Sequence, residues 1–343
     1  MELDIMTGSG RWSELAERAR QVESAGFSGM LFTETSSTPW MGIAAASMAA
    51  PSLTFSTGIA VAFPRSPMVS AALAWELAEN TKGRFRLGLG SQVRAHIERR
   101  YGAEFDPPGP RLKDYVSAVK ACLRAFNGDE RLSHDGPYYQ LSLMPAAWSP
   151  RKHSYGDIKV DISAVGPYMS RAAGEVADGI HVHPFHSVAY LDEVLIPRTS
   201  IGTAKAGRDI SDVDLIVPVF TIVGDTDEEQ EKYRQAARSQ IAFYGSTRNY
   251  GFQFDMLGFE GTSAKLNERL KAGDIPGMSS LITDEMLEHY AVTASWADLG
   301  HKLVDRYQGK ASRLVMYQAE ASIIEDPANV DKWAGVAEVV RSA

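Results

Sequence analysis

Two titratable side chains stand where the sequence predicts buried strands to end, and both could take part in acid–base chemistry. Glu34 follows an apolar run at residues 28–33, and His96 follows a strand predicted at residues 83–91. A carboxylate can bind a ligand amide or act as a base, and an imidazole titrates near neutral pH and can donate to a carbonyl oxygen. Ordinary alternatives remain open, because acidic residues also cap helices and His96 could be a solvated loop histidine.

Three further histidines, His181, His183 and His186, are spaced closely enough to suggest a metal site. Alternation along a strand places His181 and His183 on the same face. No cysteine, aspartate or glutamate accompanies them at the spacing of the known metal-binding motifs. We therefore expect no metal ion here, and we place His183 at the substrate pocket.

A glycine-rich segment, with Gly88 and Gly90 before Ser91, ends the strand predicted at residues 83–91. Glycines allow the backbone to approach a flat ligand closely, although they are also common in turns. The segment carries two of the three glycines of the dinucleotide-binding fingerprint, but Val93 occupies the third position. A Rossmann-type site is therefore weakly supported, and the Gly-x-Ser-x-Gly, Walker and Cys-x-x-Cys motifs do not occur.

Composition narrows the classes of function further. The chain has 343 residues, of which 44% are hydrophobic and 23% charged, as in globular proteins. Its net charge of -8, with both signs interspersed, leaves no basic stripe for nucleic acid. The single cysteine, Cys122, lies on a helical apolar face and is expected to be a core thiol. Since no leader-like or membrane-spanning segment is found, we expect a cytoplasmic protein without a membrane partner.

The elements that must position these residues alternate along the chain. We predict strands at residues 2–6, 28–33, 54–62, 83–91, 159–164, 179–182, 214–223 and 313–318. Helices are predicted at residues 12–25, 39–50, 67–80, 111–126, 168–177, 188–206, 227–243, 284–289, 296–310 and 327–341. Eight strand–helix units are the count of a (β/α)8 TIM barrel, here as one domain over residues 1–343. A doubly wound sheet is the minority alternative.

A plain barrel takes about 250 residues, and the remaining residues of this chain fit two insertions. The first, residues 127–156, follows the fourth helix, is rich in Gly, Pro and Tyr, and has room for a small hairpin. The second follows the seventh strand, where a helical pattern breaks at residues 244–251 and resumes to residue 272. Residues 91–110 are predicted to form a loop. Because active sites of such barrels lie at the strand ends, the candidate chemistry belongs there.

Three segments occur in an order and spacing typical of one known family. They are residues 58–67 (GIAVAFPRSP), 83–91 (GRFRLGLGS) and 166–179 (GPYMSRAAGEVADG). Together they resemble the bacterial luciferase-like flavin enzymes, and more narrowly the coenzyme F420-dependent oxidoreductases among them. The resemblance runs from Glu2 to the final helix and is least typical at residues 244–295. It implies a (β/α)8 barrel with a deazaflavin or flavin across the strand ends, hydride transfer, a small-molecule substrate and a homodimer.

The resemblance also implies roles for individual residues. It places a non-prolyl cis peptide at Gly58–Ile59, in a bulge of the third strand on which the ring of the cofactor stacks. Trp40 resembles an aromatic wall of the substrate pocket. The positions that match cofactor-binding residues of the family are Gly58, Ile59, Val61, Ser91 and His96, with Val165, Gly166 and Pro167 at the phosphate-bearing tail.

Departures from the family pattern bear on the substrate. Members that oxidise sugar phosphates tend to have Asp-His after strand two and Glu after strand four, whereas this chain has Glu34-Thr35 and Val93. The resemblance therefore implies a different small organic substrate and binding of coenzyme F420 in preference to FMN. His96 is the expected donor to the substrate oxygen, and Glu34 is expected to bond to the cofactor ring or the substrate. An FMN-dependent monooxygenase and a non-catalytic flavin-binding barrel are the alternatives.

Overall fold

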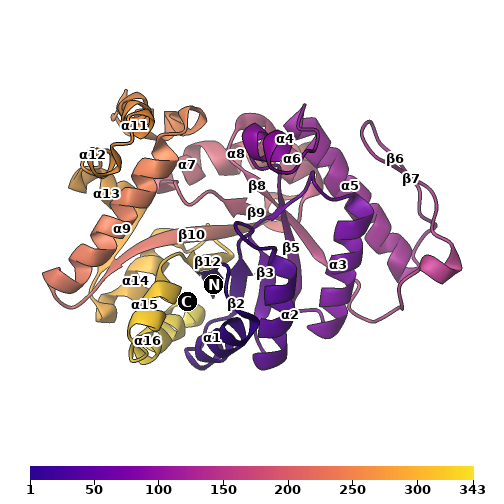
Figure 1. Cartoon of the computed structure of the whole chain (residues 1–343), viewed down its shortest axis with the longest axis horizontal. Coiled ribbons are helices and arrows are strands. Elements are labelled where there is room, and N and C mark those ends of the chain that lie inside the picture. Colours follow the sequence, from indigo (N-terminus) through magenta and orange to yellow (C-terminus); the bar gives the residue numbers. More distant parts are fainter.

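Eight parallel strands close into a barrel in the computed structural model, which describes residues 1–343 (Figure 1). The barrel strands are β1 (Glu2–Thr7), β2 (Gly29–Phe32), β3 (Thr54–Thr57), β5 (Phe85–Gly90), β8 (Lys159–Ala164), β9 (Gly179–Val182), β10 (Asp214–Val223) and β12 (Arg313–Met316). They pair in this order, and β12 pairs with β1 to close the sheet. The (β/α)8 prediction is confirmed. The doubly wound alternative is wrong, because the pairing of β12 with β1 closes the sheet, whereas a doubly wound sheet is open.

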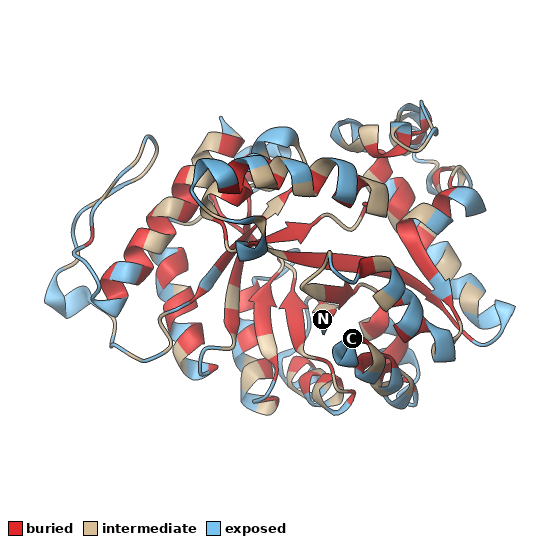
Figure 2. Ribbon diagram, turned by 180° about the vertical axis from the view of Figure 1, so that it is seen from behind, coloured by how far each residue is buried: buried red, intermediate tan, exposed pale blue.

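Helices surround the barrel and turn their buried faces toward the strands (Figure 2). In α1, for example, the buried residues are Leu15, Ala19 and Val22, which recur at helical spacing. The surrounding helices are α1 (Trp12–Ser24), α2 (Pro39–Ala49), α3 (Pro67–Asn80), α5 (Pro108–Asn127), α6 (Pro167–Val176), α14 (Trp296–Tyr307), α15 (Ala319–Glu325) and α16 (Asn329–Ser342). The helix predicted at residues 188–206 consists of α7 (Val188–Tyr190), a π-helical turn (Leu191–Leu195) and α8 (Ile196–Lys205).

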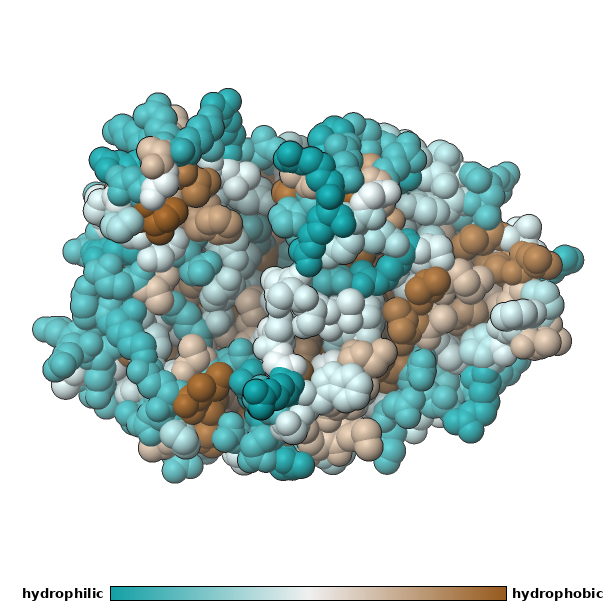
Figure 3. Space-filling model, in the orientation of Figure 1, coloured by the Kyte–Doolittle hydropathy of each residue, from teal (hydrophilic) through white to brown (hydrophobic).

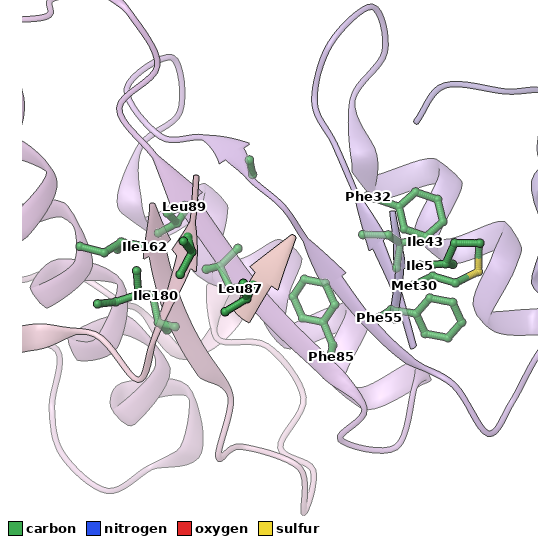
Figure 4. Close-up of a cluster of buried hydrophobic side chains, with 14 of the residues drawn as sticks. Ile5, Met30, Phe32, Ile43, Phe55, Phe85, Leu87, Leu89, Ile162 and Ile180 are labelled. Carbon is green, nitrogen blue, oxygen red and sulfur yellow. The ribbon is translucent and has the colours of Figure 1, made fainter. Parts of the chain in front are cut away.

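Strand side chains alternate between the helix layer and the barrel interior. Those that point outward join the main hydrophobic core, part of which Figure 4 shows with Phe55, Phe85, Leu87, Leu89, Ile162 and Ile180. Inside the barrel, Leu31, Ile216 and Val315 form a separate small cluster with Met6 packed against it. The interior is therefore filled by side chains at its middle.

Ion pairs fill the interior at the amino-terminal ends of the strands. Arg86 Nη2 lies 2.8 Å from Asp161 Oδ1, and Arg86 Nη1 lies 2.8 Å from Asp214 Oδ2. On the opposite side, Arg313 Nε lies 2.6 Å from Asp4 Oδ2. With apolar and paired charged groups filling the barrel, a ligand can enter only from the carboxyl ends of the strands.

A hairpin follows α5, as predicted for residues 127–156, and it extends to the right in Figure 1. It pairs β6 (His134–Asp135) with β7 (Gln140–Leu141). The buried carboxylate of Asp114 on α5 anchors it, since Oδ1 lies 2.9 Å from His134 Nε2 and Oδ2 accepts from the backbone N–H groups of Tyr138 and Tyr139. A 3-10 turn (Ala146–Trp148) lies beyond the hairpin.

Two local predictions are wrong in detail. The third strand, predicted as continuous over residues 54–62, divides into β3 and β4 (Ala60–Val61), and β4 pairs with β5 rather than continuing beside β2. The predicted loop at residues 91–110 contains a short helix, α4 (Arg94–Arg99), which buries Ile97. One apolar residue per turn is too weak a pattern to predict this helix from sequence.

A further strand and a group of helices follow β10. The helices are α9 (Asp227–Gly245), a 3-10 turn (Arg248–Tyr250), α10 (Phe252–Asp255), α11 (Thr262–Lys271), α12 (Ile275–Ser279) and α13 (Asp284–Tyr290). They share a second hydrophobic cluster with Phe185 and Phe220 at the barrel rim. Strand β11 (Ala291–Ala294), which was not predicted, pairs with the last four residues of β10. Its four residues are too few to show a period.

The outer surface is mostly hydrophilic, with apolar residues gathered in separate patches on the face in Figure 3. Leu143 and Trp148 in the segment after α5 are 78% and 82% exposed. No helix of the structure combines the length and the apolar character needed to cross a membrane.

Candidate active site at the carboxyl ends of the barrel strands

Most of the predicted site residues lie on one face of the barrel, because the carboxyl ends of parallel strands meet there. The residues at or just beyond a strand end are Glu34, Gly58, Ile59, Val61, Ser91, Val165 and His183. Trp40 lies in the first turn of α2, and Pro167 begins α6. His96 lies on α4, where its side chain is exposed and makes no hydrogen bond within the protein.

Glu34 is held in an ion pair with Arg65, a residue that sequence reasoning did not single out. Glu34 Oε1 lies 2.5 Å from Arg65 Nη2, and Oε2 accepts from Arg65 Nη1 at 2.9 Å and from the N–H of Val61 at 2.7 Å. Arg65 also donates to the carbonyl of Val61 at 2.9 Å. The pair therefore fixes β4 to the end of β2, and both carboxylate oxygens of Glu34 are occupied by protein donors.

Trp40 extends this arrangement toward α2. The helix begins with Pro39 at its first position, which favours a helix start. The indole is 6% exposed, its Nε1 has no hydrogen-bond partner, and the guanidinium of Arg65 lies 5.6 Å from the ring centroid. A buried N–H without a partner is uncommon in proteins, so Trp40 Nε1 is an unsatisfied donor at this edge of the site.

The peptide between Gly58 and Ile59 is cis, as the resemblance predicts. A Cβ on Gly58 would lie 2.0 Å from Leu31 Cδ2, and a Cβ on Gly90 would lie 2.6 Å from Ile59 Cδ1 and 2.8 Å from Ser163 Oγ. Glycine is therefore required at both positions so that the bulge can pack against β2 and β5.

Gly88, two residues before Gly90 in β5, is also required to be glycine. A Cβ there would lie 2.0 Å from the carbonyl oxygen of Thr57 and 2.4 Å from His181 Nε2. Thr57 Oγ1 accepts from the N–H of Gly88 at 2.9 Å and donates to its carbonyl at 2.7 Å. The interpretation that these strand glycines make room for a flat ligand is wrong, because neighbouring protein atoms fill the space.

Val165, Gly166 and Pro167 lead into the amino terminus of α6. Gly166 is the N-cap, and a Cβ built on it would meet nothing within 4 Å. The loop is held by Tyr190, whose hydroxyl donates to the carbonyl of Val165 at 2.8 Å, and by Ser170, whose hydroxyl donates to the carbonyl of Gly166 at 3.0 Å. The first turn of a helix presents free N–H groups and a partial positive charge, so this end of α6 can bind an anionic group.

The three closely spaced histidines do not converge. His181 faces the barrel interior with Nε2 3.8 Å from Asp161 Oδ2, His183 points to the mouth, and His186 Nδ1 lies 3.0 Å from the carbonyl of His183. Burial lowers the pKa of His181 and His186 to about 4 and that of His183 to about 3. The structure contains no group of three or more His, Cys, Asp or Glu side chains placed to hold a metal ion.

Three tyrosines near His183 were not identified from the sequence. Tyr244 and Tyr317 place their hydroxyl oxygens 2.6 Å apart, and the rings of Tyr244 and Tyr250 lie 4.8 and 4.5 Å from the imidazole of His183. Tyr317 was detectable in principle, because it falls in the strand predicted at residues 313–318. Tyr244 and Tyr250 could not be found this way, since they lie where the helical pattern breaks.

Residues 2–313 match the model of a family described as luciferase-like monooxygenase. The chain is 35% identical over 300 residues to an uncharacterized protein of Mycobacterium tuberculosis, with 88% of each chain covered. It is 25% identical over 286 residues to the 5,10-methylenetetrahydromethanopterin reductase of Methanolobus tindarius, with 81% of this chain and 82% of the reductase covered.

Solved structures of similar fold include enzymes with either of two cofactors. The coenzyme F420 dependent tetrahydromethanopterin reductase of Methanopyrus kandleri aligns with a TM-score of 0.79 and 16% identity, over 99% of this chain and 98% of the reductase. The oxygenating constituent of 3,6-diketocamphane monooxygenase from Pseudomonas putida, in complex with FMN, aligns with a TM-score of 0.67 and 18% identity, over 99% and 97%. From the match over residues 2–313, the chain belongs to the luciferase-like monooxygenase family.

Proposed function

We propose that this protein is an oxidoreductase that uses coenzyme F420 to transfer hydride to or from a small organic substrate. The observation that carries the proposal is the 25% identity with the methylenetetrahydromethanopterin reductase over 81% of this chain. The structurally similar reductase of Methanopyrus kandleri is described as coenzyme F420 dependent. Both enzymes are named as reductases, which favours hydride transfer over oxygenation.

The residues present fit a ring with an anionic tail. The cis bulge at Gly58–Ile59, with Val61 and Ser91 beside it, offers a backbone surface for the ring, and the open N-cap of α6 at Gly166 suits the tail. When bound, the deazaflavin would supply or accept the hydride, and the protein contributes position and electrostatics. We propose that Glu34 acts on the ring or the substrate indirectly, because it holds Arg65 and β4 in the positions from which they can contact the ligand.

His96 is the proposed donor to the substrate oxygen. It lies on α4 directly beyond β5, and its ring is free of other hydrogen bonds, so it can turn toward the mouth. An acid–base group contributes about 100-fold or more to a rate. We expect His96→Ala to lower the single-turnover rate of hydride transfer from reduced F420 by that factor, with little change in cofactor affinity.

The single-turnover experiment uses saturating cofactor and a panel of ketones and secondary alcohols. His301→Ala, at an exposed histidine on α14, is the matched control and should leave the rate unchanged. Equal rates in wild type and His96→Ala would reduce His96 to a surface residue. Absence of turnover with every substrate, while F420 still binds, would favour a non-catalytic barrel.

An FMN-dependent monooxygenase is the second candidate, and the FMN complex of a similar fold favours it. Purification of the protein with stoichiometric, slowly exchanging FMN would support this candidate and overturn the first.

We also propose a homodimer, because α2 carries no charged residue yet exposes Met41 and Met48 by 54% and 88%. Light scattering on wild type and Met48→Glu tests this, with a monomeric variant as the expected result.

A further inference from the structure

Four side chains gather at the barrel mouth on the side away from β3 and β5, and we call them the tyrosine–histidine subsite: His183, Tyr244, Tyr250 and Tyr317. Tyr317 follows β12 two residues after Val315, which faces the barrel interior, so alternation directs Tyr317 to the mouth. His183 follows β9 and shares the inward face of His181 in the same way. Tyr244 and Tyr250 approach from the end of α9 and the turn after it.

The subsite presents hydrogen-bond donors that the protein does not use. In the 2.6 Å contact between Tyr244 and Tyr317, one hydroxyl donates and the other accepts, which leaves the accepting hydroxyl with its own hydrogen free. His183 Nδ1 accepts from the N–H of Phe185 at 3.1 Å, so the proton of the neutral ring is on Nε2. All four side chains are half-buried, so solvent or a ligand can reach them.

No formal charge is present in the subsite. Burial raises the pKa of the Tyr244, Tyr250 and Tyr317 hydroxyls, and burial lowers the pKa of His183 to about 3. None of the hydrogen bonds or ring contacts of the four side chains involves a charged group. Every member is therefore neutral at physiological pH.

Two carboxylates near the strand ends are neutralised by arginines, and the unpaired Arg248 in the turn that carries Tyr250 is exposed. Glu34 is paired with Arg65, and Glu320 on α15 is paired with Arg18 at 2.5 Å while it also accepts from Thr7. A phosphate or carboxylate bound among the four side chains would lose hydration without gaining a counter-charge from any of them, which is unfavourable. A neutral oxygen would instead accept hydrogen bonds from the free donors, while the ring of Tyr317, which packs 4.8 Å from that of the buried Phe220, offers apolar contact.

From this geometry we propose that the tyrosine–histidine subsite binds an uncharged oxygen-bearing group of the substrate, a carbonyl or hydroxyl other than the reacting oxygen assigned to His96, and discriminates against anionic substrates. The inference rests on the proposed function, since it assigns a substrate class to the same active site. It uses residues that no part of the cofactor proposal uses, so the two can fail separately.

The test compares two ligands of similar shape and different charge, cyclohexanecarboxamide and cyclohexanecarboxylate, by calorimetry on the purified protein with and without F420. We expect the carboxamide to bind at least about tenfold more tightly than the carboxylate. Tyr244→Phe and Tyr317→Phe each remove one hydroxyl and should weaken carboxamide binding by about fivefold, the scale of one hydrogen bond. Carboxylate binding should not change.

Tyr233→Phe is the matched control, because Tyr233 lies on the same helix three turns before Tyr244. This variant should bind both ligands like wild type, and melting temperatures of all variants should show that each one folds. The proposal is overturned if the carboxylate binds as tightly as the carboxamide, if neither ligand binds at millimolar concentration, or if both subsite variants bind the carboxamide like wild type. Failure to bind F420, with the carboxamide preference intact, would overturn only the cofactor proposal.

Discussion

Glu34→Gln distinguishes a structural role of the Glu34–Arg65 pair from a direct role of Glu34 in chemistry. Glutamine keeps the size of the side chain and an oxygen that can accept from the N–H of Val61, but it removes the negative charge opposite Arg65. The Glu34 side chain is 2% exposed and that of Arg65 is 16% exposed. The substitution therefore leaves a largely desolvated guanidinium without its counter-charge.

The expected loss of stability follows from this burial. Removing one partner of a buried ion pair costs about 3–5 kcal/mol. Arg65 keeps its 2.9 Å bond to the carbonyl of Val61 and some contact with water, so we expect a smaller loss for Glu34→Gln, about 2–3 kcal/mol. Because β4 is held by the same carboxylate, cofactor affinity should also fall.

Urea unfolding of the two single variants, Glu34→Gln and Arg65→Met, and of the double variant measures the coupling. We expect a coupling energy of at least about 1 kcal/mol. Glu14→Gln is the control, because its pair with Arg11 is exposed and should contribute less than about 0.5 kcal/mol. A change in stability below about 0.5 kcal/mol for Glu34→Gln, with no coupling, would refute the structural account. Lost turnover in such a stable variant would place Glu34 in the chemistry.

Three further changes are predicted. His186→Phe should flatten the dependence of stability on pH, because burial lowers the folded pKa of His186 to about 4, below the unfolded 6.5. The contribution of His186 to stability is complete above pH 6.5 and falls as the pH drops toward 4, by about 2 kcal/mol between pH 7 and pH 5. Urea titrations at several pH values measure this, and a slope equal to that of wild type would contradict it. Gly90→Ala should cost about 1–3 kcal/mol of unfolding free energy, because its Cβ would lie 2.6 Å from Ile59 Cδ1, and an unchanged urea midpoint would contradict this. Asp114→Ala should release the hairpin after α5 and speed proteolysis within residues 128–150, while the rate of cleavage elsewhere stays the same.

The sequence predicts the strand–helix alternation well because residues typical of turns and helix ends bound the apolar runs. The strands at residues 159–164, 179–182 and 214–223 and the helix at residues 67–80 have the predicted bounds in the structure. The divided third strand has a different origin. The contacts of Gly58 with Leu31 and of Ile59 with Gly90 join residues far apart in the chain, so no local pattern reports them.

The candidate site is predicted by position more than by chemistry. The position of Glu34 after a predicted strand places it at the barrel mouth, the family resemblance adds Trp40 and Val61, and the structure brings the three together around Arg65. An acidic residue near a strand end does not reveal its partner, because the partner lies 31 residues away in sequence. The hydroxyl pair of Tyr244 and Tyr317 is hidden for the same reason, with 73 residues between them.

The central claim, that the site uses coenzyme F420, is tested most directly by titrating the cofactor-free protein with F420 and with FMN in parallel. Quenching of tryptophan fluorescence reports binding, and Trp40 beside β4 places a reporter near the proposed ring site. The account predicts that F420 binds at least about tenfold more tightly than FMN. Tighter binding of FMN, or no binding of F420 at concentrations at which FMN saturates the protein, would contradict it.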